Sequence, residues 1–425
     1  MDRRQYLKHF MVLFSGTAGA QLANLASYPL LGRLYSPVDF GVFAMFVAVS
    51  AIPGAIACGR FDLAVPTAPK AGRYAIYWLC LAIAAGMGLV STVGSALYWG
   101  VTGAGVSPVL PLMLGLCVFL TGFCAASSLY LMRHDAYRLN SASLLLRTGG
   151  TVLVQIGLAF VWRDPMSLIV GFTAGFAAQA LLLAWAVWRF VPPRRPRLSQ
   201  MRAMFARYRR QVTVDIPSTF IAAVSLNLLT FLLLSLYGEQ AVGYYSLGNR
   251  IAILPLQLFN DALSQVFFQK AARAQEERGD FWNEMKFNVI ASGLLSIGVL
   301  CGVWLLAKPF ITIYLGQRWA PAGDILIILA PMLAVRSLCM SIGTTVFVLR
   351  RAHWLLLHNI ANAAVLGIAY LIARASGLEL NSFLWLAAGL LIVEYGAFAL
   401  WLILAAWRGR KQPVSGPLVA RRVSK

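Results

Sequence analysis

The chain has 425 residues, of which 60% are hydrophobic and 12% are charged, and its formal net charge is +21. Soluble domains carry about twice that share of charged residues, so the composition excludes an ordinary soluble enzyme and indicates an integral membrane protein. It also excludes a nucleic-acid partner, because the basic residues are not gathered with exposed aromatics on a soluble domain.

Apolar runs long enough to cross a membrane occur along the whole chain. A spanning helix needs roughly 20 mostly apolar residues. The N-terminal run resembles a signal peptide at its start, but it continues to Leu31 with polar residues at helical spacing, so we interpret it as a retained first span. The predicted spans are 9-32, 39-58, 74-99, 107-131, 142-162, 166-190, 212-236, 241-268, 285-307, 325-349, 354-373 and 381-407. The sequence therefore predicts an all-α integral membrane protein with twelve transmembrane helices.

The two halves of the chain repeat each other at an offset of 202 residues. Leu34-Tyr35, Gly41, Phe43 and Pro53 recur as Leu236-Tyr237, Gly243, Tyr245 and Pro255. A duplicated helical bundle is typical of transporters, whose halves move against each other around a site at their interface. We therefore expect two six-helix repeats around a central cavity. Pro53 and Pro255 are hinge candidates within their helices, or kinks that are merely tolerated.

Four segments follow from this division. They are an N-terminal six-helix bundle (1-190), a basic cytoplasmic linker (191-211), a C-terminal six-helix bundle (212-407) and a basic cytoplasmic tail (408-425). The segment from Arg189 to Arg210, both included, carries eight arginines and no acid. Apolar residues recur there every three or four positions, which predicts an amphipathic helix on anionic lipids at the cytoplasmic face, or a segment that only enforces topology. The segment 269-286 has balanced charges and is expected to extend the eighth span into the cytoplasm.

The charges sort by side of the membrane. Both termini and the loops after even-numbered spans carry a large excess of Lys and Arg, whereas the loops after odd-numbered spans hold as many acids as bases. By the positive-inside rule, both termini are cytoplasmic. In a bacterium this membrane would be the inner membrane.

Polar residues form stripes within several predicted spans. Arg250, Gln257 and Asp261 fall on one face of the eighth span at 100° per residue. A charge facing lipid near the bilayer centre costs at least about 2.5–3.5 kcal/mol, so such groups should point inward. The cavity candidates are Arg250, Arg336, Gln257, Asp261, Gln21 and Asn24.

Alternatives stay open for each charged candidate. Arg250 and Arg336 start roughly 14–17 Å inside the external ends of their spans, where they line a cavity or form a buried ion pair. Asp215 and Asp261 lie near the cytoplasmic ends and either contribute to function or only cap helices. Glu394 is the mid-membrane acid, which pairs with an arginine or carries a proton. Glu394 and Asp215 are the candidates for ion coupling.

Signals for catalysis and cofactors are weak. His353 and His358 are five residues apart, which does not place two metal ligands on one helical face. No Walker sequence occurs, the external loops are short, and the cysteines show no extracellular pairing pattern. We therefore predict no enzyme activity, no metal and no cofactor.

Two runs carry a resemblance to a known family. Arg33-Leu-Tyr-Ser-Pro-Val-Asp-Phe-Gly-Val-Phe-Ala with Gly59-Arg-Phe-Asp-Leu-Ala-Val, and Val242-Gly-Tyr-Tyr-Ser-Leu-Gly-Asn-Arg with Pro255-Leu, resemble segments of bacterial polysaccharide-biosynthesis flippases. These O-antigen translocases belong to the multidrug/oligosaccharidyl-lipid/polysaccharide exporter superfamily. The acid in Val214-Asp-Ile-Pro-Ser departs from the more neutral segment expected of that family.

The resemblance implies a V-shaped pair of six-helix bundles with alternating access and no use of ATP. The implied cargo is an undecaprenyl-diphosphate-linked oligosaccharide, moved to the periplasmic leaflet for O-antigen, capsule or exopolysaccharide assembly. A polysaccharide polymerase and chain-length proteins would then be partners. A multidrug exporter of the same superfamily, a peptidoglycan-precursor flippase and a non-transporting component of a glycan assembly complex remain alternatives. A drug exporter should favour acids over arginines in its cavity.

Overall fold

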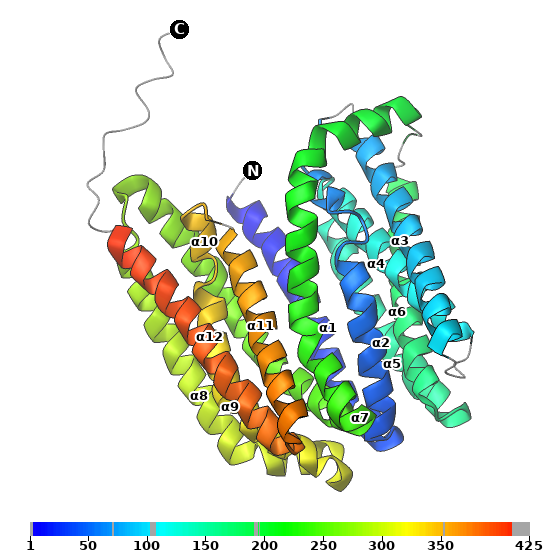
Figure 1. Ribbon diagram of the computed structural model, residues 1–425. Coiled ribbons are helices and arrows are strands. Elements are labelled where there is room, and N and C mark those ends of the chain that lie inside the picture. The colour runs from blue at the N-terminus through cyan, green and yellow to red at the C-terminus, as the bar shows by residue number, and fades with distance from the viewer. Residues whose placement is uncertain are drawn as a thin grey trace. The chain divides into compact units, whose positions relative to one another are not determined.

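The structure is a computed structural model that describes residues 3–69, 72–102, 108–190, 194, 196–351 and 353–409. The predicted tail lies outside the described residues beyond Gly409, as does part of the predicted linker. Throughout the described ranges the regular structure is helical (Figure 1). The elements are α1 (Arg3–Leu34), α2 (Pro37–Ala55), η1 (Phe61–Ala64), α3 (Arg73–Thr102), α4 (Val109–Met132), α5 (Tyr137–Val161), α6 (Pro165–Phe190), α7 (Leu198–Arg278), α8 (Trp282–Leu315), η2 (Gln317–Trp319), α9 (Ala320–Ile342), α10 (Thr345–Val348), α11 (His353–Ser376) and α12 (Leu380–Gly409).

Ten helical segments among the described residues are long and apolar enough to cross a membrane. One of them, Asp215–Arg278, has 64 residues and holds the predicted seventh and eighth spans, which a non-helical residue, Gly238, separates. The first predicted span lies in α1, which has 32 residues and is not among the ten. The prediction of an all-α membrane protein is therefore confirmed.

The chain forms two compact units, each described separately below. Unit 1 comprises Met1–Ser246 with Tyr314–Trp319, and unit 2 comprises Leu247–Ile313 with Ala320–Lys425. The boundary between the units falls inside α7, whereas the sequence repeat divides the chain at the linker. The division into bundles 1-190 and 212-407 stays a prediction, because compactness and internal symmetry are different properties.

Unit 1 is a bundle in which α5 packs on α6 and α1, α3 packs on α4, and α2 lies against α4 and α6. The start of α2 explains the motif Ser36-Pro-Val-Asp. Ser36 Oγ accepts a hydrogen bond from the Asp39 backbone N–H (3.2 Å), and Asp39 Oδ2 accepts one from the Ser36 N–H (2.7 Å). This capping box satisfies two backbone donors at the helix start, and Pro37 follows at the position where its missing N–H costs nothing.

The sequence repeat meets itself in space within unit 1. A Cβ on Gly41 would fall on the carbonyl oxygen of Glu239, and a Cβ on Gly243 would fall on the carbonyl oxygen of Pro37. Position 239 is the repeat partner of 37, and 243 is the partner of 41, so the two contacts are reciprocal. Only glycine allows α2 and α7 to approach this closely. The repeated glycines are thus required by one symmetric helix crossing.

The linker helix lies against unit 1 at the start of α7. The Phe205 ring packs on Phe61 with centroids 5.4 Å apart, and Tyr208 packs against the same buried cluster. Arg202, Arg207 and Arg209 are exposed. The apolar side of the predicted amphipathic helix is therefore partly used by the protein itself.

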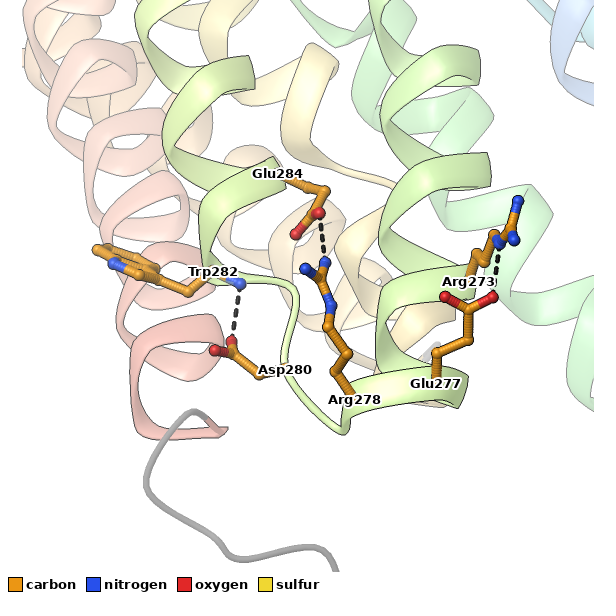
Figure 2. Close-up of polar contacts among 6 residues, drawn as sticks. All are labelled: Arg273, Glu277, Arg278, Asp280, Trp282 and Glu284. Carbon is orange, nitrogen blue, oxygen red and sulfur yellow. Dashed lines mark hydrogen bonds and ion pairs between the residues drawn. The ribbon is translucent and has the colours of Figure 1, made fainter.

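In unit 2, α12 packs on both α9 and α11. The helix after the eighth span continues to Arg278, as the balanced charges of residues 269-286 predict. A tight turn follows at Gly279, which adopts a left-handed φ of +68° that favours glycine. Figure 2 shows how polar contacts fix this hairpin: Arg278 pairs with Glu284 (2.5 Å), and Asp280 Oδ1 accepts a hydrogen bond from the Trp282 N–H (2.8 Å).

Candidate functional site

A polar cavity of about 280 Å³ opens within unit 2 between α7 and α9. Three of the predicted site residues, Gln257, Asp261 and Arg336, line it together. The first two are one helical turn apart on α7, because residues four positions apart share a face. Arg336 comes from α9. The cavity thus combines a guanidinium, a carboxylate and amide groups at membrane depth.

The cavity wall is organised by hydrogen bonds between the two helices. Ser337 Oγ donates to Asn260 Oδ1 (2.9 Å), and both side chains are buried at the cavity edge. Deeper in unit 2, Asn288 of α8 donates from Nδ2 to the Ser341 carbonyl oxygen (3.0 Å). These bonds hold α9 to α7 and α8, so Arg336 sits on a helix that is fixed on two sides.

Unit 2 also contains a buried ionisable pair outside the lining of the polar cavity. His358 Nδ1 of α11 and Glu394 Oε1 of α12 are 2.7 Å apart, and the two side chains are 8% and 7% exposed. Glu394 Oε2 is also buried and accepts no hydrogen bond from the described residues. The pair answers the question left open for Glu394: its direct partner is a histidine and not an arginine.

Aromatic rings enclose this pair. The Phe398 ring stacks on the His358 imidazole with centroids 4.3 Å apart and planes 9° apart. The Tyr395 ring lies 5.5 Å from His358, and its hydroxyl accepts a hydrogen bond from Asn362 Nδ2 (3.1 Å). The rings separate the pair from lipid and bulk water. In such an apolar environment the interaction between the imidazole and the carboxyl group is stronger than it would be in water.

The polar cavity and the buried pair share an electrostatic neighbourhood. Arg336 and Glu394 both lie within electrostatic range of the Cys339 thiol and the Tyr395 hydroxyl. Arg336 and Cys339 are three positions apart on α9 and therefore share a helical face. Arg336, which lines the polar cavity, therefore also lies near the side chains of Cys339 and Tyr395.

The other predicted site residues lie elsewhere. Arg250 is half-buried on α7 of unit 2 but is not part of the lining of the polar cavity. Gln21 and Asn24 are half-buried on α1, and Asp215 is half-buried on α7, all within unit 1. Their roles in binding or coupling stay predictions.

An apolar groove of about 790 Å³ lies within unit 1. Five helices contribute to it, and none of the described residues that line it is charged. Two serines of α3 line the groove, but their hydroxyls donate hydrogen bonds within the helix: Ser91 to the Met87 carbonyl and Ser95 to the Ser91 carbonyl. They therefore offer few polar groups to a ligand. Tyr98 and Trp99 of α3 also line the groove. This lining suits an alkyl or prenyl chain.

The predicted hinges are found at different places in their helices. Pro53 lines the groove and lies in the last turn of α2. The backbone N–H of Ile56, the residue after this helix, donates a hydrogen bond to the Pro53 carbonyl. Pro255 lies inside α7, where the non-helical residue is Gly238 and not the proline. A hinge role for either proline stays a prediction.

Two residues make contacts that the sequence does not predict. The spacing of His353 and His358 argues only against a metal site, whereas the partner of His358 is 36 positions away in the chain. Arg147, near the start of the predicted span 142-162, lies well inside α5, with its guanidinium 4.8 Å from the centre of the Phe176 ring. No local pattern signals either contact, because each depends on which helices become neighbours.

The fold is that of solved membrane exporters. The chain is similar to a multidrug resistance MATE family transporter of the MOP superfamily in an inward-facing conformation, with a TM-score of 0.71 and 15% identity over 93% of this chain and 96% of that one. It is also similar to the lipid II flippase MurJ in an inward closed conformation, with a TM-score of 0.70 and 14% identity over 93% and 87%. At such identities the likeness establishes the fold alone: a multi-pass membrane protein with the exporter fold.

The family follows from the sequence match. Residues 30–324 match the family described as "Polysaccharide biosynthesis protein", and the chain belongs to this family. It is 24% identical over 325 residues to the succinoglycan biosynthesis transport protein ExoT of Rhizobium meliloti (strain 1021), covering 74% of this chain and 63% of that protein. It is 23% identical over 189 residues to the lipopolysaccharide biosynthesis protein WzxC of Escherichia coli (strain K12), covering 44% and 37%. The chain thus spans less than two thirds of either relative.

Proposed function

We propose that this protein moves a lipid-linked oligosaccharide, carried on undecaprenyl diphosphate, from the cytoplasmic to the periplasmic leaflet of a bacterial inner membrane. The single observation that carries the proposal is the polar cavity with Arg336, built between membrane helices of a polysaccharide biosynthesis family member. A guanidinium matches phosphate oxygens through paired N–H donors, and amide groups such as Gln257 suit sugar hydroxyls.

The apolar groove of unit 1 supports the lipid part of this cargo. Its 790 Å³ is lined by apolar side chains, and a prenyl chain needs no polar partner. The names of the two curated relatives and of the solved lipid II flippase point to the same class of substrate. Transport would proceed by alternating access without ATP, with Glu394 and Asp215 as candidates for ion coupling. The product would serve O-antigen, capsule or exopolysaccharide assembly, with a polymerase and chain-length proteins as candidate partners.

A deletion strain tests the transport step. Export should stop while synthesis of the lipid-linked unit continues, so labelled unit should accumulate in the inner leaflet and surface polysaccharide should disappear. Complementation with the wild-type gene is the control. A strain that lacks the lipid-linked unit itself would instead point to a biosynthetic enzyme.

Drug export is the second candidate, because MATE transporters share the fold. The polar cavity holds Arg336 beside the acid Asp261, and the arginine repels the cationic drugs that the acid would attract. Deletion should therefore leave resistance to cationic drugs unchanged, and a marked loss of resistance would favour the second candidate.

The proposed orientation places both termini in the cytoplasm and anionic lipids against the linker arginines. A reporter active only outside the cytoplasm should be active when fused after Gly377, between α11 and α12, and silent at the C-terminus. The opposite result would overturn the orientation without affecting the proposed substrate.

A further inference from the structure

We propose that a slot between α3 and the linker helix binds one anionic phospholipid, with an acyl chain in the slot and the headgroup phosphate at the linker arginines. This site goes beyond the proposed function and does not rest on it, because it requires a membrane but no transported cargo. The expected attraction of the linker to anionic lipids has no fixed position, whereas the slot holds a single lipid molecule.

The slot has a volume of about 570 Å³ and lies within unit 1. Its walls come from α3 and from the start of α7, and the lining residues are Trp78, Leu81, Ala82, Pro196 and Met201. The three residues of α3 are three or four positions apart, so they share one face of the helix. None of these described lining residues is charged. Such a slot suits an acyl chain, because a polar ligand would lose its hydrogen bonds to water there.

Aromatic residues place the slot at the surface of the membrane. Trp78 lies in the second turn of α3, which is long and apolar enough to span the membrane. Its ring centroid is 6.5 Å from that of Trp188, which is exposed near the end of α6. Tryptophan side chains are enriched at the interface between membrane and water. A lipid whose acyl chain enters the slot from the bilayer would therefore have its headgroup beside the linker.

The linker side of the slot is positively charged. Arg197 and Arg202 are exposed, and each directly follows a lining residue, Pro196 or Met201. Neither α3 nor α6 contains an acidic residue, and the linker sequence contains none. A phosphate beside the slot therefore meets arginines without a competing carboxylate on these elements. Guanidinium groups match phosphate oxygens through paired N–H donors.

One polar atom of the slot lining also lacks a partner. Nε1 of Trp78 is buried and donates to no acceptor among the described residues. Buried donors of this kind are rare in folded proteins, because an unmade hydrogen bond costs free energy. An ester or phosphate oxygen of a lipid beside Trp78 would accept this bond, whereas a hydrocarbon chain alone offers no acceptor. The slot thus favours a ligand with both an acyl chain and oxygen atoms near it.

The test measures lipid binding to the full-length protein in detergent by native mass spectrometry. The probes are phosphatidylglycerol and phosphatidylethanolamine with identical acyl chains, undecaprenyl phosphate and inorganic phosphate. We expect one phosphatidylglycerol to bind more tightly than either of the other lipids. Inorganic phosphate should not displace it, because phosphate has no chain to fill the slot.

Variants separate the contribution of charge from that of the slot. Arg197→Gln and Arg202→Gln should each weaken binding of phosphatidylglycerol roughly fivefold, the usual contribution of one basic residue near an anionic lipid. Ala82→Trp fills the slot from an exposed position and should abolish tight binding.

Two further variants are matched controls. Arg209→Gln removes an exposed arginine of the same helix, eight positions after Met201. Ala96→Trp adds the same large side chain at an exposed alanine near the other end of α3. Both variants should keep the wild-type affinity for phosphatidylglycerol.

Several results would overturn the proposal. Equal affinity for the two phospholipids would remove the role of the headgroup charge, and wild-type affinity of Ala82→Trp would remove the slot. Equal losses in Arg202→Gln and Arg209→Gln would show a diffuse attraction to the linker. Tighter binding of undecaprenyl phosphate would assign the slot to a prenyl lipid. If Ala82→Trp inserts poorly, the arginine variants decide, because they change only exposed side chains. Transport of the cargo is tested separately by the deletion strain.

Discussion

The two units place different kinds of side chain inside the membrane. Unit 2 holds a polar cavity lined by Gln257 and Arg336, and it also buries the ionisable pair His358–Glu394. Unit 1 instead leaves an apolar groove, and its deep Arg147 lies against the Phe176 ring. Two parts of a chain that repeat in sequence can therefore differ in the polarity of their interior side chains. If the comparison is right, charge changes in unit 2 and shape changes in unit 1 should damage transport by different routes.

The largest expected effect is on the buried pair. His358→Leu leaves Glu394 buried without its partner, and breaking such a pair costs roughly 3–5 kcal/mol. Thermal unfolding in detergent should show this loss, together with reduced membrane abundance. The double variant His358→Leu with Glu394→Leu removes both polar partners, so most of the stability should return while transport does not. Equal destabilisation of the single and double variants would mean that cavities, and not the unpaired acid, cause the loss.

Unit 1 should respond most strongly at the helix crossing. Gly41→Ala or Gly243→Ala places a methyl group on a backbone carbonyl that cannot move aside, so the cost should reach about 3 kcal/mol, the upper end for overpacking. Unfolding temperature and export should fall together in both variants. Gly389→Ala on α12 is the matched control, because an added Cβ there meets open space. Wild-type behaviour of the two crossing variants would show that α2 and α7 do not approach in this way.

Substitutions in the polar cavity should reduce export without reducing the stability of the protein. Arg336→Ala removes the proposed phosphate contact, and hydrogen bonds to charged groups contribute about 1.5–3 kcal/mol, so export should fall roughly 10- to 150-fold at normal abundance. Arg336→Lys should rescue export only partly, since an ammonium lacks the paired donors. Arg250→Ala and Arg250→Lys apply the same comparison to the arginine outside the lining. Surface polysaccharide measured beside membrane abundance separates a binding role from a structural one, in which both would fall.

Export should depend on the free volume of the apolar groove and not on charge within it. Gly94→Trp fills part of the groove without adding charge, and we expect export to fall several-fold while the protein inserts normally. Gly149→Trp, at another helical glycine with open space around it, should have little effect. Photo-crosslinking from position 95 should capture a prenyl lipid. Capture of membrane phospholipid only, with normal export by Gly94→Trp, would remove the groove from the proposed transport path.

Local patterns in the sequence predicted the helices and part of the site, and the reasons are physical. Apolar run length determines where a helix can cross a bilayer, so most spans were found within a few residues, and helical periodicity placed Gln257 and Asp261 on one face. The repeat at Gly41 and Gly243 was visible as a pattern, but its reciprocal contact was not. The His358–Glu394 pair could not be predicted, because it depends on the packing of α11 against α12 and not on spacing within either helix.

The smallest expected effect concerns an acid of unit 1 that lies outside the membrane spans. Burial raises the pKa of Asp62, and the nearby Arg60 only partly offsets this. The Asp62 carboxyl group therefore binds its proton more tightly in the native state than in the unfolded chain. The free energy of unfolding should fall as the pH rises from the unfolded-state pKa of Asp62 through its raised native pKa, and it should stay level at higher pH. Asp62→Asn should remove this slope and make the protein slightly more stable at neutral pH, as thermal unfolding at several pH values would show. If the comparison between the units is right, Asp62→Asn leaves the pH dependence of transport unchanged, since Asp62 is not one of the candidates for ion coupling. A transport pH profile that moves with Asp62→Asn would place ionisable chemistry in both units.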